Sequence, residues 1–330
     1  FFTPKPAYAM LRSLVGSEMC IRDSIFSLQI KAADIKLAVL KYGTVNWELN
    51  VIKEHKLDKK YNLNIDVTYL TNKNASAIAL MSNAVDMIVT DWVWVSRQRD
   101  KGKDFSLIPY STAAGAIMVP KNSSIENIED LKGSQIGIAG GSIDKSWILI
   151  RAYTMKVHGY DLSKHIEPAY AAPPLINGMA QKGELDGALN YWNYTARLKA
   201  LNFRKVISVE DILPEIGIGK SLPLIGYVFS QKWAKSNGEA IEGFIAASNE
   251  AREILKNNDE EWNRIKNITG AKNTETLIAL RDGFRKGIPQ ENFIGYKNAI
   301  EKAYEILAEI GGKDLVGNNS KLSDGVIWSK

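Results

Sequence analysis

Cysteine and histidine are scarce in this 330-residue sequence, which has one cysteine, Cys20, and three histidines. A single cysteine cannot form a disulfide framework or a cysteine-based zinc site. The histidines, His55, His158 and His165, are not spaced with each other or with carboxylates as metal ligands usually are. We therefore expect no metal site, and we interpret the histidines as surface residues.

Long apolar runs and blocks of like charge are also missing. No apolar run reaches the roughly 20 residues that a membrane-spanning helix needs. The 42 Lys and Arg residues and the 37 Asp and Glu residues are scattered along the sequence and leave a net charge of +5. This distribution argues against nucleic acid as a partner, because nucleic-acid-binding proteins gather their basic residues.

The sequence motifs of catalysis and phosphate binding are absent as well. There is no G-x-S-x-G nucleophile elbow and no P-loop. The glycines of GELDG, residues 183–187, are interpreted as a helix-to-strand turn and not as a phosphate cradle. We therefore expect no catalytic residues and no cofactor.

The first 33 residues differ in character from the rest of the sequence. Residues 1–24 have no clear periodicity, and SLVGSEMCIRDS within them resembles translated sequencing-adapter read-through. Residues 25–34, IFSLQIKAAD, look like the end of a signal peptide with a small-residue cleavage site at Ala32-Ala33. We expect residues 1–33 to be non-native sequence or the remnant of a truncated signal peptide.

From Ile35 onward, short apolar segments typical of strands alternate with segments of helical periodicity. This alternation predicts an α/β fold with mostly parallel sheets. After residue 230 only helical periodicity remains, over residues 241–255 and 293–310. The expected strands are residues 35–40, 63–70, 84–90, 105–109, 116–119, 136–139, 166–170, 185–190, 205–209 and 223–230.

The strands and helices form two similar series, and the apolar faces of the last helices need a partner. The first series is the most economical partner for them. We therefore expect two lobes, with hinge-like segments near residues 116–120 and 222–227. The expected first lobe is discontinuous, with residues 34–118 and 224–330, and the second lobe contains residues 119–223.

Residues 133–153, GSQIGIAGGSIDKSWILIRAY, predict a buried strand, a glycine turn and a helix that begins near Ser142. Glycines let the backbone approach a ligand closely, and the free N–H groups at a helix start attract anions. The alternative is an ordinary strand-to-helix connection in which Ser142 or Asp144 caps the helix. From these residues alone, both interpretations stay open.

Several polar and aromatic residues directly follow predicted strands, where open α/β sheets bind their ligands. Asp91 can pair with an amine of a ligand, or it can cap the helix that follows it. Tryptophans and tyrosines at these turns can hold a ring or a methylated cation, or they can pack against their own lobe. We expect about half of them in the core, with Trp94 and Tyr194 among these.

The order of these features resembles that of the type II periplasmic substrate-binding proteins of ABC importers, in the branch that binds sulfonates, taurine and thiamine precursors. The resemblance covers residues 35–328. It rests on the segments IKLAVLKYG, NASAIALMSNAVDMIVTDW, SSIENIEDLKGSQIGIAGGS and LINGMAQKGELDGALNYW. It implies a two-lobed clamp with its C-terminal helices on the first lobe.

The ligand contacts of that family come from turns at strand ends. The sequence departs from the sulfonate pattern at Asp144-Lys145, because a carboxylate in the first helical turn competes with an anionic ligand for the helix dipole. On the matching positions, the resemblance implies the ligand-binding residues Tyr42, Asn46, Trp47, Asn74, Ala75, Ser76, Asp91, Trp92, Gly140, Gly141, Ser142, Tyr191, Trp192 and Asn193.

The resemblance also implies a function. We expect a monomeric, non-catalytic periplasmic receptor that delivers a small organic solute to the permease of an ABC importer. The solute is expected to be a sulfonate, a thiamine-pyrimidine-like compound or another nutrient with a ring or an amine. One alternative is an enzyme on the same fold, such as a pyrimidine-precursor synthase or a small-molecule lyase, although the cysteine-rich motif of the pyrimidine-forming enzymes is absent. Another is a sensor domain that contacts a partner protein.

Overall fold

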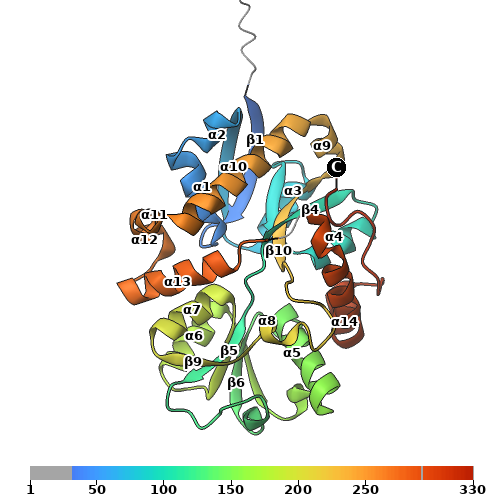
Figure 1. Cartoon of the computed structure of the whole chain (residues 1–330). Coiled ribbons are helices and arrows are strands. Elements are labelled where there is room, and N and C mark those ends of the chain that lie inside the picture. The colour runs from blue at the N-terminus through green and yellow to red at the C-terminus, as the bar shows by residue number, and fades with distance from the viewer. Residues whose placement is uncertain (1–31, 291–292, 330) are drawn as a thin grey trace, which may run out of the picture. The chain divides into compact units, whose positions relative to one another are not determined.

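The computed structural model describes residues 32–290 and 293–329. The adapter-like residues 1–24 and most of the expected signal-peptide remnant lie outside the described residues. The described part contains two five-stranded sheets, each covered by helices on both faces (Figure 1). Within these residues, no helix is both long enough and apolar enough to cross a membrane.

The first sheet has four strands in one direction and one in the other. β1 pairs in parallel with β2 and β3, whereas β10 runs antiparallel to both β3 and β4. These strands are β1 (Ala33–Leu40), β2 (Leu63–Leu70), β3 (Met87–Thr90), β4 (Phe105–Ser111) and β10 (Ile225–Ser230), in the spatial order β2-β1-β3-β10-β4.

The second sheet repeats this topology. β6 pairs in parallel with β7 and β8, and β5 runs antiparallel to β8 and β9. Its strands are β5 (Ala116–Pro120), β6 (Gln135–Ala139), β7 (Glu167–Ala171), β8 (Gly187–Asn190) and β9 (Phe203–Ser208), in the order β7-β6-β8-β5-β9. In each sheet one strand runs opposite to the other four, β10 in the first and β5 in the second. Each of these is the first strand after the chain has crossed from the other sheet. The prediction of mostly parallel sheets is confirmed.

Helices cover both faces of the first sheet, and the second half of β1 is accordingly buried and apolar on both faces. Ile35, Leu37 and Val39 point into one apolar cluster, and Ala38 points into another. The first cluster is covered by α1 (Val45–Glu54), α2 (Leu57–Lys60) and α10 (Gly238–Asn257), and the second by α3 (Lys73–Met81) and α4 (Trp92–Arg99).

The second sheet is covered in the same way. One apolar cluster, which includes Met118 of β5, Ile176 of α6 and Leu198 of α7, joins the sheet to α6 and α7. Ile136 and Ile138 belong to the cluster that contains α5. The covering helices are α5 (Lys145–Tyr153), α6 (Pro173–Gln181), α7 (Trp192–Ala200) and α8 (Val209–Ile212).

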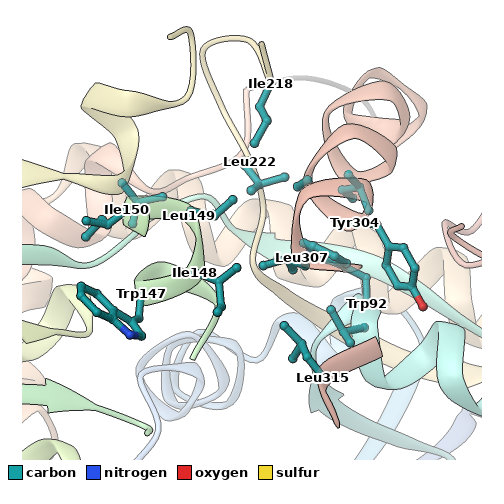
Figure 2. Close-up of a cluster of buried hydrophobic side chains, with 14 of the residues drawn as sticks. Trp92, Trp147, Ile148, Leu149, Ile150, Ile218, Leu222, Tyr304, Leu307 and Leu315 are labelled. Carbon is teal, nitrogen blue, oxygen red and sulfur yellow. The ribbon is translucent and has the colours of Figure 1, made fainter. Parts of the chain in front are cut away.

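The C-terminal helices contact helices of both sheets. α10 packs against α1 and the first sheet, as expected, but α13 (Thr274–Lys286) packs on α7, and α14 (Lys297–Val316) packs on both α4 and α5. Figure 2 shows side chains of α4, α5 and α14 in one cluster, among them Trp92, Leu149 and Leu307. One apolar cluster therefore continues from the first sheet to the second.

The helix expected near Ser142 begins at Lys145, because Asp144 caps it, and α3 begins at Lys73, because Asn72 caps it. Within residues 123–131, only a 3-10 turn, η1 (Glu129–Leu131), is helical. The remaining short elements are η2 (Thr154–His158), η3 (Leu162–Lys164), α9 (Gln231–Ser236), α11 (Asp259–Arg264), α12 (Lys266–Thr269) and η4 (Phe293–Tyr296).

Candidate functional site

The candidate site lies where the carboxyl ends of the central strands of both sheets meet. Asp91 follows β3 in the first sheet, and Lys145 begins the helix that follows β6 in the second. The Lys145 Nζ atom donates to Asp91 Oδ2 at 3.1 Å, and both side chains are largely buried. This ion pair shows that the strand-end turns of the two sheets face each other.

The backbone explains how Asp91 reaches this position. Thr90 ends β3, and Asp91 keeps an extended conformation before α4 begins at Trp92. Its Oδ1 atom accepts a hydrogen bond from the amide of Trp94 at 3.0 Å, which leaves Oδ2 directed at Lys145. Asp91 therefore caps α4 and also offers a charged group to the site.

Asp144 changes what the start of α5 can bind. Its Oδ1 atom accepts hydrogen bonds from the amides of Ser146 and Trp147, at 2.9 and 3.3 Å. These are amides that an anion would otherwise use at a helix start. Of the two interpretations of this turn, the structure supports the capped connection, so an anion here would depend on side chains.

The turn after β6 requires glycine for two reasons, its backbone conformation and the side chains that lie close to it. Gly140 and Gly141 have φ angles of +88° and +96°, which favour glycine. A Cβ atom on Gly140 would lie 2.6 Å from the Tyr191 hydroxyl oxygen and 2.9 Å from Asp144 Oδ2. Tyr191, at the end of β8, is thus brought to Asp144, and burial followed by the Asp144 charge raises the pKa of its hydroxyl.

Four charged residues form what we call the charged cluster, namely Lys73, Asp91, Asp144 and Lys145. Lys73 is the first residue of α3, and the neighbouring Lys145 ammonium lowers its pKa. Burial alone would lower the pKa of Lys145, but Asp91 and Asp144 outweigh it and raise that pKa. Burial raises the pKa of Asp144. The four side chains are therefore electrostatically coupled.

The pH dependence of stability is expected to report this cluster. Burial alone would raise the pKa of Asp91, but Lys145, Lys73 and the Trp94 amide together lower it from 3.8 to about 2. Because the folded pKa is depressed, the stabilisation is complete above the ordinary pKa and is lost as the pH falls through about 2.

This shift corresponds to about 2 kcal/mol. We expect Asp91→Asn, which keeps a helix-capping side chain, to be less stable than the parent by about that amount near pH 6. In urea unfolding the difference should shrink as the pH falls toward about 2. A difference that stays constant with pH would contradict the ionised, paired state of Asp91.

Two of the expected ligand-binding tryptophans are core residues. The Trp92 ring is fully buried and lies near Tyr304 in the apolar cluster (Figure 2). Its Nε1 atom donates to the carbonyl oxygen of Pro223 at 2.7 Å. Trp47 is also buried, with its ring 5.7 Å from that of Trp262 and 5.9 Å from that of Trp192. The expectation that the rings of Trp47 and Trp92 face a solute is corrected, because both are enclosed by helices.

Trp192 is only half-buried, but it also has a packing partner. A Cβ atom on Gly283 of α13 would lie 3.0 Å from its ring, so the missing side chain makes room for the indole. Trp192 therefore packs between Trp47 and α13.

The other expected site residues fall into two groups. Asp91, Gly140 and Tyr191 are brought together around Asp144 and Lys145, whereas Tyr42 is 86% exposed. Asn46 donates to the carbonyl oxygens of Leu40 and Lys41 and so holds its own turn. Of the remaining expected residues, Asn74 and Ser142 are exposed, Ala75, Gly141 and Asn193 are half-buried, and Ser76 is buried.

The sequence interpretation missed both lysines as site residues. Lys73 is not among the expected site residues, and Lys145 enters only as a departure from the sulfonate pattern. The signal was present, since a lysine in the first turn of a helix is unfavourable for the helix dipole unless an anion lies nearby. Asn190 was also missed; it accepts from the Tyr191 amide and donates to Asn177, which fixes the turn that carries Tyr191.

No group of three or more His, Cys, Asp or Glu residues within the described residues is arranged to hold a metal ion. The histidines there have other partners, because His55 contacts Glu261 and His158 contacts Glu129. The candidate site is therefore an arrangement of ammonium groups, carboxylates and one hydroxyl.

Two sheets of identical topology, joined by two chain crossings and with charged turns at their facing strand ends, define a periplasmic-binding-protein fold. Within this class, the chain belongs to the NMT1/THI5-like family, whose model matches residues 59–262. A curated relative from Escherichia coli strain K12, named for binding aliphatic sulfonates, is 28% identical over 155 residues. That match covers 46% of this chain and less than half, 44%, of the relative.

Solved structures show the same fold. The periplasmic aliphatic sulphonate binding protein SsuA from Escherichia coli has a TM-score of 0.71 at 18% identity, covering 90% of this chain and 92% of that one. The alkanesulfonate-binding protein SsuA from Xanthomonas axonopodis pv. citri, bound to MOPS, has a TM-score of 0.62 at 17% identity, covering 90% and 98%. An ABC transporter structure from Parabacteroides distasonis has a TM-score of 0.68 at 14% identity, covering 90% and 99%.

Proposed function

We propose that this chain is a periplasmic solute receptor of an ABC importer and that its solute is a small organic acid of the sulfonate kind. The observation that carries the proposal is the charged cluster, which joins the strand-end turns of the two sheets through the ion pair of Lys145 and Asp91. Open α/β sheets bind ligands at such strand ends. The names of the sulfonate-binding relatives support the same class of solute.

Solute binding would involve both sheets. We propose that residues 34–118 and 224–330 form one lobe and residues 119–223 the other, and that the lobes close on the solute by a hinge motion. The two segments that pass between the sheets, residues 112–115 and 209–224, are the places where such a motion can occur. A receptor of this kind would present the closed form to a permease, and we propose that it does so as a monomer.

Lys73 and Lys145 are the proposed anion-binding groups. Asp144 already accepts hydrogen bonds from the amides at the start of α5. The lysine ammonium groups are therefore the donors that remain for an anion. Each ammonium has three N–H donors, and Lys145 uses one of them on Asp91. A sulfonate has three oxygen atoms that accept hydrogen bonds. One sulfonate group can therefore accept from the ammonium groups of Lys73 and Lys145 at the same time.

The site lacks the features of the alternative, an enzyme. Catalytic groups are held ready to act on a substrate, usually as a nucleophile beside a base. Here Asp91 and Asp144 each cap a helix, and the Tyr191 hydroxyl has a raised pKa that keeps it protonated. We therefore propose a receptor that releases its solute unchanged.

Ligand-dependent stabilisation without turnover tests the proposed function. We expect a panel of short sulfonates to raise the melting temperature by several degrees, because a ligand at 100 times its Kd adds about 2.7 kcal/mol to the free energy of unfolding. Mass spectrometry should recover the ligand unchanged. Lys145→Met should remove the shift, whereas Lys103→Met, a change at an exposed lysine, should keep it. A chemically altered ligand would overturn the receptor in favour of an enzyme.

A further inference from the structure

Arg197 joins the two proposed lobes at a place outside the charged cluster. It lies on α7 of the second lobe, and its two Nη atoms donate to the carbonyl oxygens of Thr269 and Gly270, at 2.7 and 3.1 Å. These residues end α12, which packs against α1, α11 and α13 of the first lobe. Tyr191 of the site precedes α7, and Arg197 lies about 9 Å further along the helix axis. The contact therefore links the lobes away from the place proposed for the solute.

The chemistry of this contact makes it specific. The last carbonyl groups of a helix have no partner within it, and the planar fork of an arginine offers donors to two of them at once. Burial lowers the pKa of Arg197, yet its guanidinium stays charged at neutral pH, so both hydrogen bonds are charge-assisted. These bonds form only while α7 and α12 lie side by side.

A second polar contact between the lobes is weaker. Lys286 of α13 pairs with Glu210 of α8, but the Lys286 side chain is 67% exposed. Water screens such an exposed pair, which then contributes little to stability. Arg197 is half-buried and has two acceptors, so it is the stronger of the two links.

Both chain crossings lie far from Arg197. The crossing at residues 112–115 contacts the C-terminal end of α13, where the Thr112 amide donates to the carbonyl oxygen of Gly287 at 2.8 Å. Arg197 binds α12, beyond the other end of α13, and this helix of 13 residues is about 20 Å long. The second crossing packs in the cluster of α14, where Figure 2 shows Leu222 together with Leu307. A rotation of the lobes about these crossings would therefore separate Arg197 from α12.

We propose that Arg197 is a latch that stabilises the closed arrangement of the lobes and so sets the affinity for the solute from outside the binding site. This inference rests on the proposed receptor function and its hinge motion. A solute that is held by both lobes binds the closed arrangement, and its apparent affinity scales with the population of that arrangement. Loss of the latch should lower this population and speed the dissociation of the solute, although the charged cluster is unchanged.

Binding of ethanesulfonate to the full chain tests the latch. We expect Arg197→Met to weaken binding about tenfold in isothermal titration calorimetry, because two charge-assisted hydrogen bonds of the closed arrangement are lost. The dissociation rate, followed by tryptophan fluorescence, should rise accordingly. Arg197→Lys keeps the charge but lacks the planar fork, so its affinity should be intermediate. The control is Lys199→Met, which changes an exposed lysine of the same helix and should keep the parent affinity.

A distance measurement separates a latch from a direct effect on the site. The single cysteine is first removed by Cys20→Ser, and spin labels are attached through Lys59→Cys at α2 and Lys182→Cys at the end of α6, both at exposed positions on different lobes. Pulsed electron paramagnetic resonance without ligand should show longer distances in Arg197→Met than in the labelled parent. Excess ethanesulfonate should restore the shorter distance.

Each other outcome has a definite meaning. Unchanged affinity and unchanged distances in Arg197→Met would overturn the latch and leave the receptor in place. Weaker binding with unchanged distances would also overturn the latch, because Arg197 would then act on the site itself. If neither ethanesulfonate nor other short sulfonates bind the parent protein, the proposed function is overturned, whereas the distances measured without ligand still decide the latch.

Discussion

Arg252→Met is expected to lower the free energy of unfolding by about 3–5 kcal/mol, because it leaves a buried carboxylate without its charge partner. Glu48 of α1 is fully buried and accepts a hydrogen bond from Arg252 Nε of α10 at 2.8 Å. It also accepts from the hydroxyls of Tyr227 and Ser248, at 2.8 and 2.6 Å. The network ties α1 and α10 to β10, on one face of the first sheet.

A double variant separates the loss of charge pairing from the loss of packing. With Glu48→Gln added, the buried negative charge is removed, so the double variant should be more stable than Arg252→Met alone in chemical unfolding. Arg281→Met is the control, since this arginine pairs with the exposed side chains of Asp259 and Asp282 and should contribute about 0–1 kcal/mol. If Arg252→Met and Arg281→Met cost equally little, Glu48 is not held by a buried ion pair.

Trp92→Ala is expected to cost about 3–5 kcal/mol of stability, because it opens a cavity beside Tyr304. Trp92→Phe should cost less, since it keeps a ring, but it leaves the Pro223 carbonyl without its donor, at about 1–3 kcal/mol. Both variants are to be measured by thermal and urea unfolding.

The exposed Tyr42 provides the control, and Tyr42→Ala should stay within about 0.5 kcal/mol of the parent. The variants also test whether Trp92 binds the solute. If Trp92→Ala keeps the stability of the parent but loses affinity for a sulfonate, the ring lines the binding site after all. A loss of stability with unchanged affinity in Trp92→Phe would confirm its place in the core.

The sequence by itself determined the alternation of strands and helices, most strand positions and the glycine turn. These are local properties. A strand segment buried on both faces must be apolar, as residues 37–39 of β1 are, and a backbone with positive φ favours glycine, as at Gly140 and Gly141. The sequence also placed Asp91 correctly at the end of a strand, because the change from strand to helical periodicity marks that position.

Only the tertiary structure decided which of the strand-end residues face the site. Trp47, Trp92 and Tyr191 all follow strands, but helices far away in the sequence cover the first two: α11 and α13 cover Trp47, and α14 covers Trp92. Whether an aromatic side chain is buried depends on such distant partners, and periodicity carries no information about them.

The same reason explains the lysines of the charged cluster. Lys73 and Lys145 lie 72 positions apart in the sequence. Lys73 begins α3, which packs on the first sheet, and Lys145 begins α5, which packs on the second. Taken alone, each is an unremarkable charged residue beside a helix cap. Their role depends on the pairing of Lys145 with Asp91 across the two sheets, because charges influence one another through space and not along the sequence.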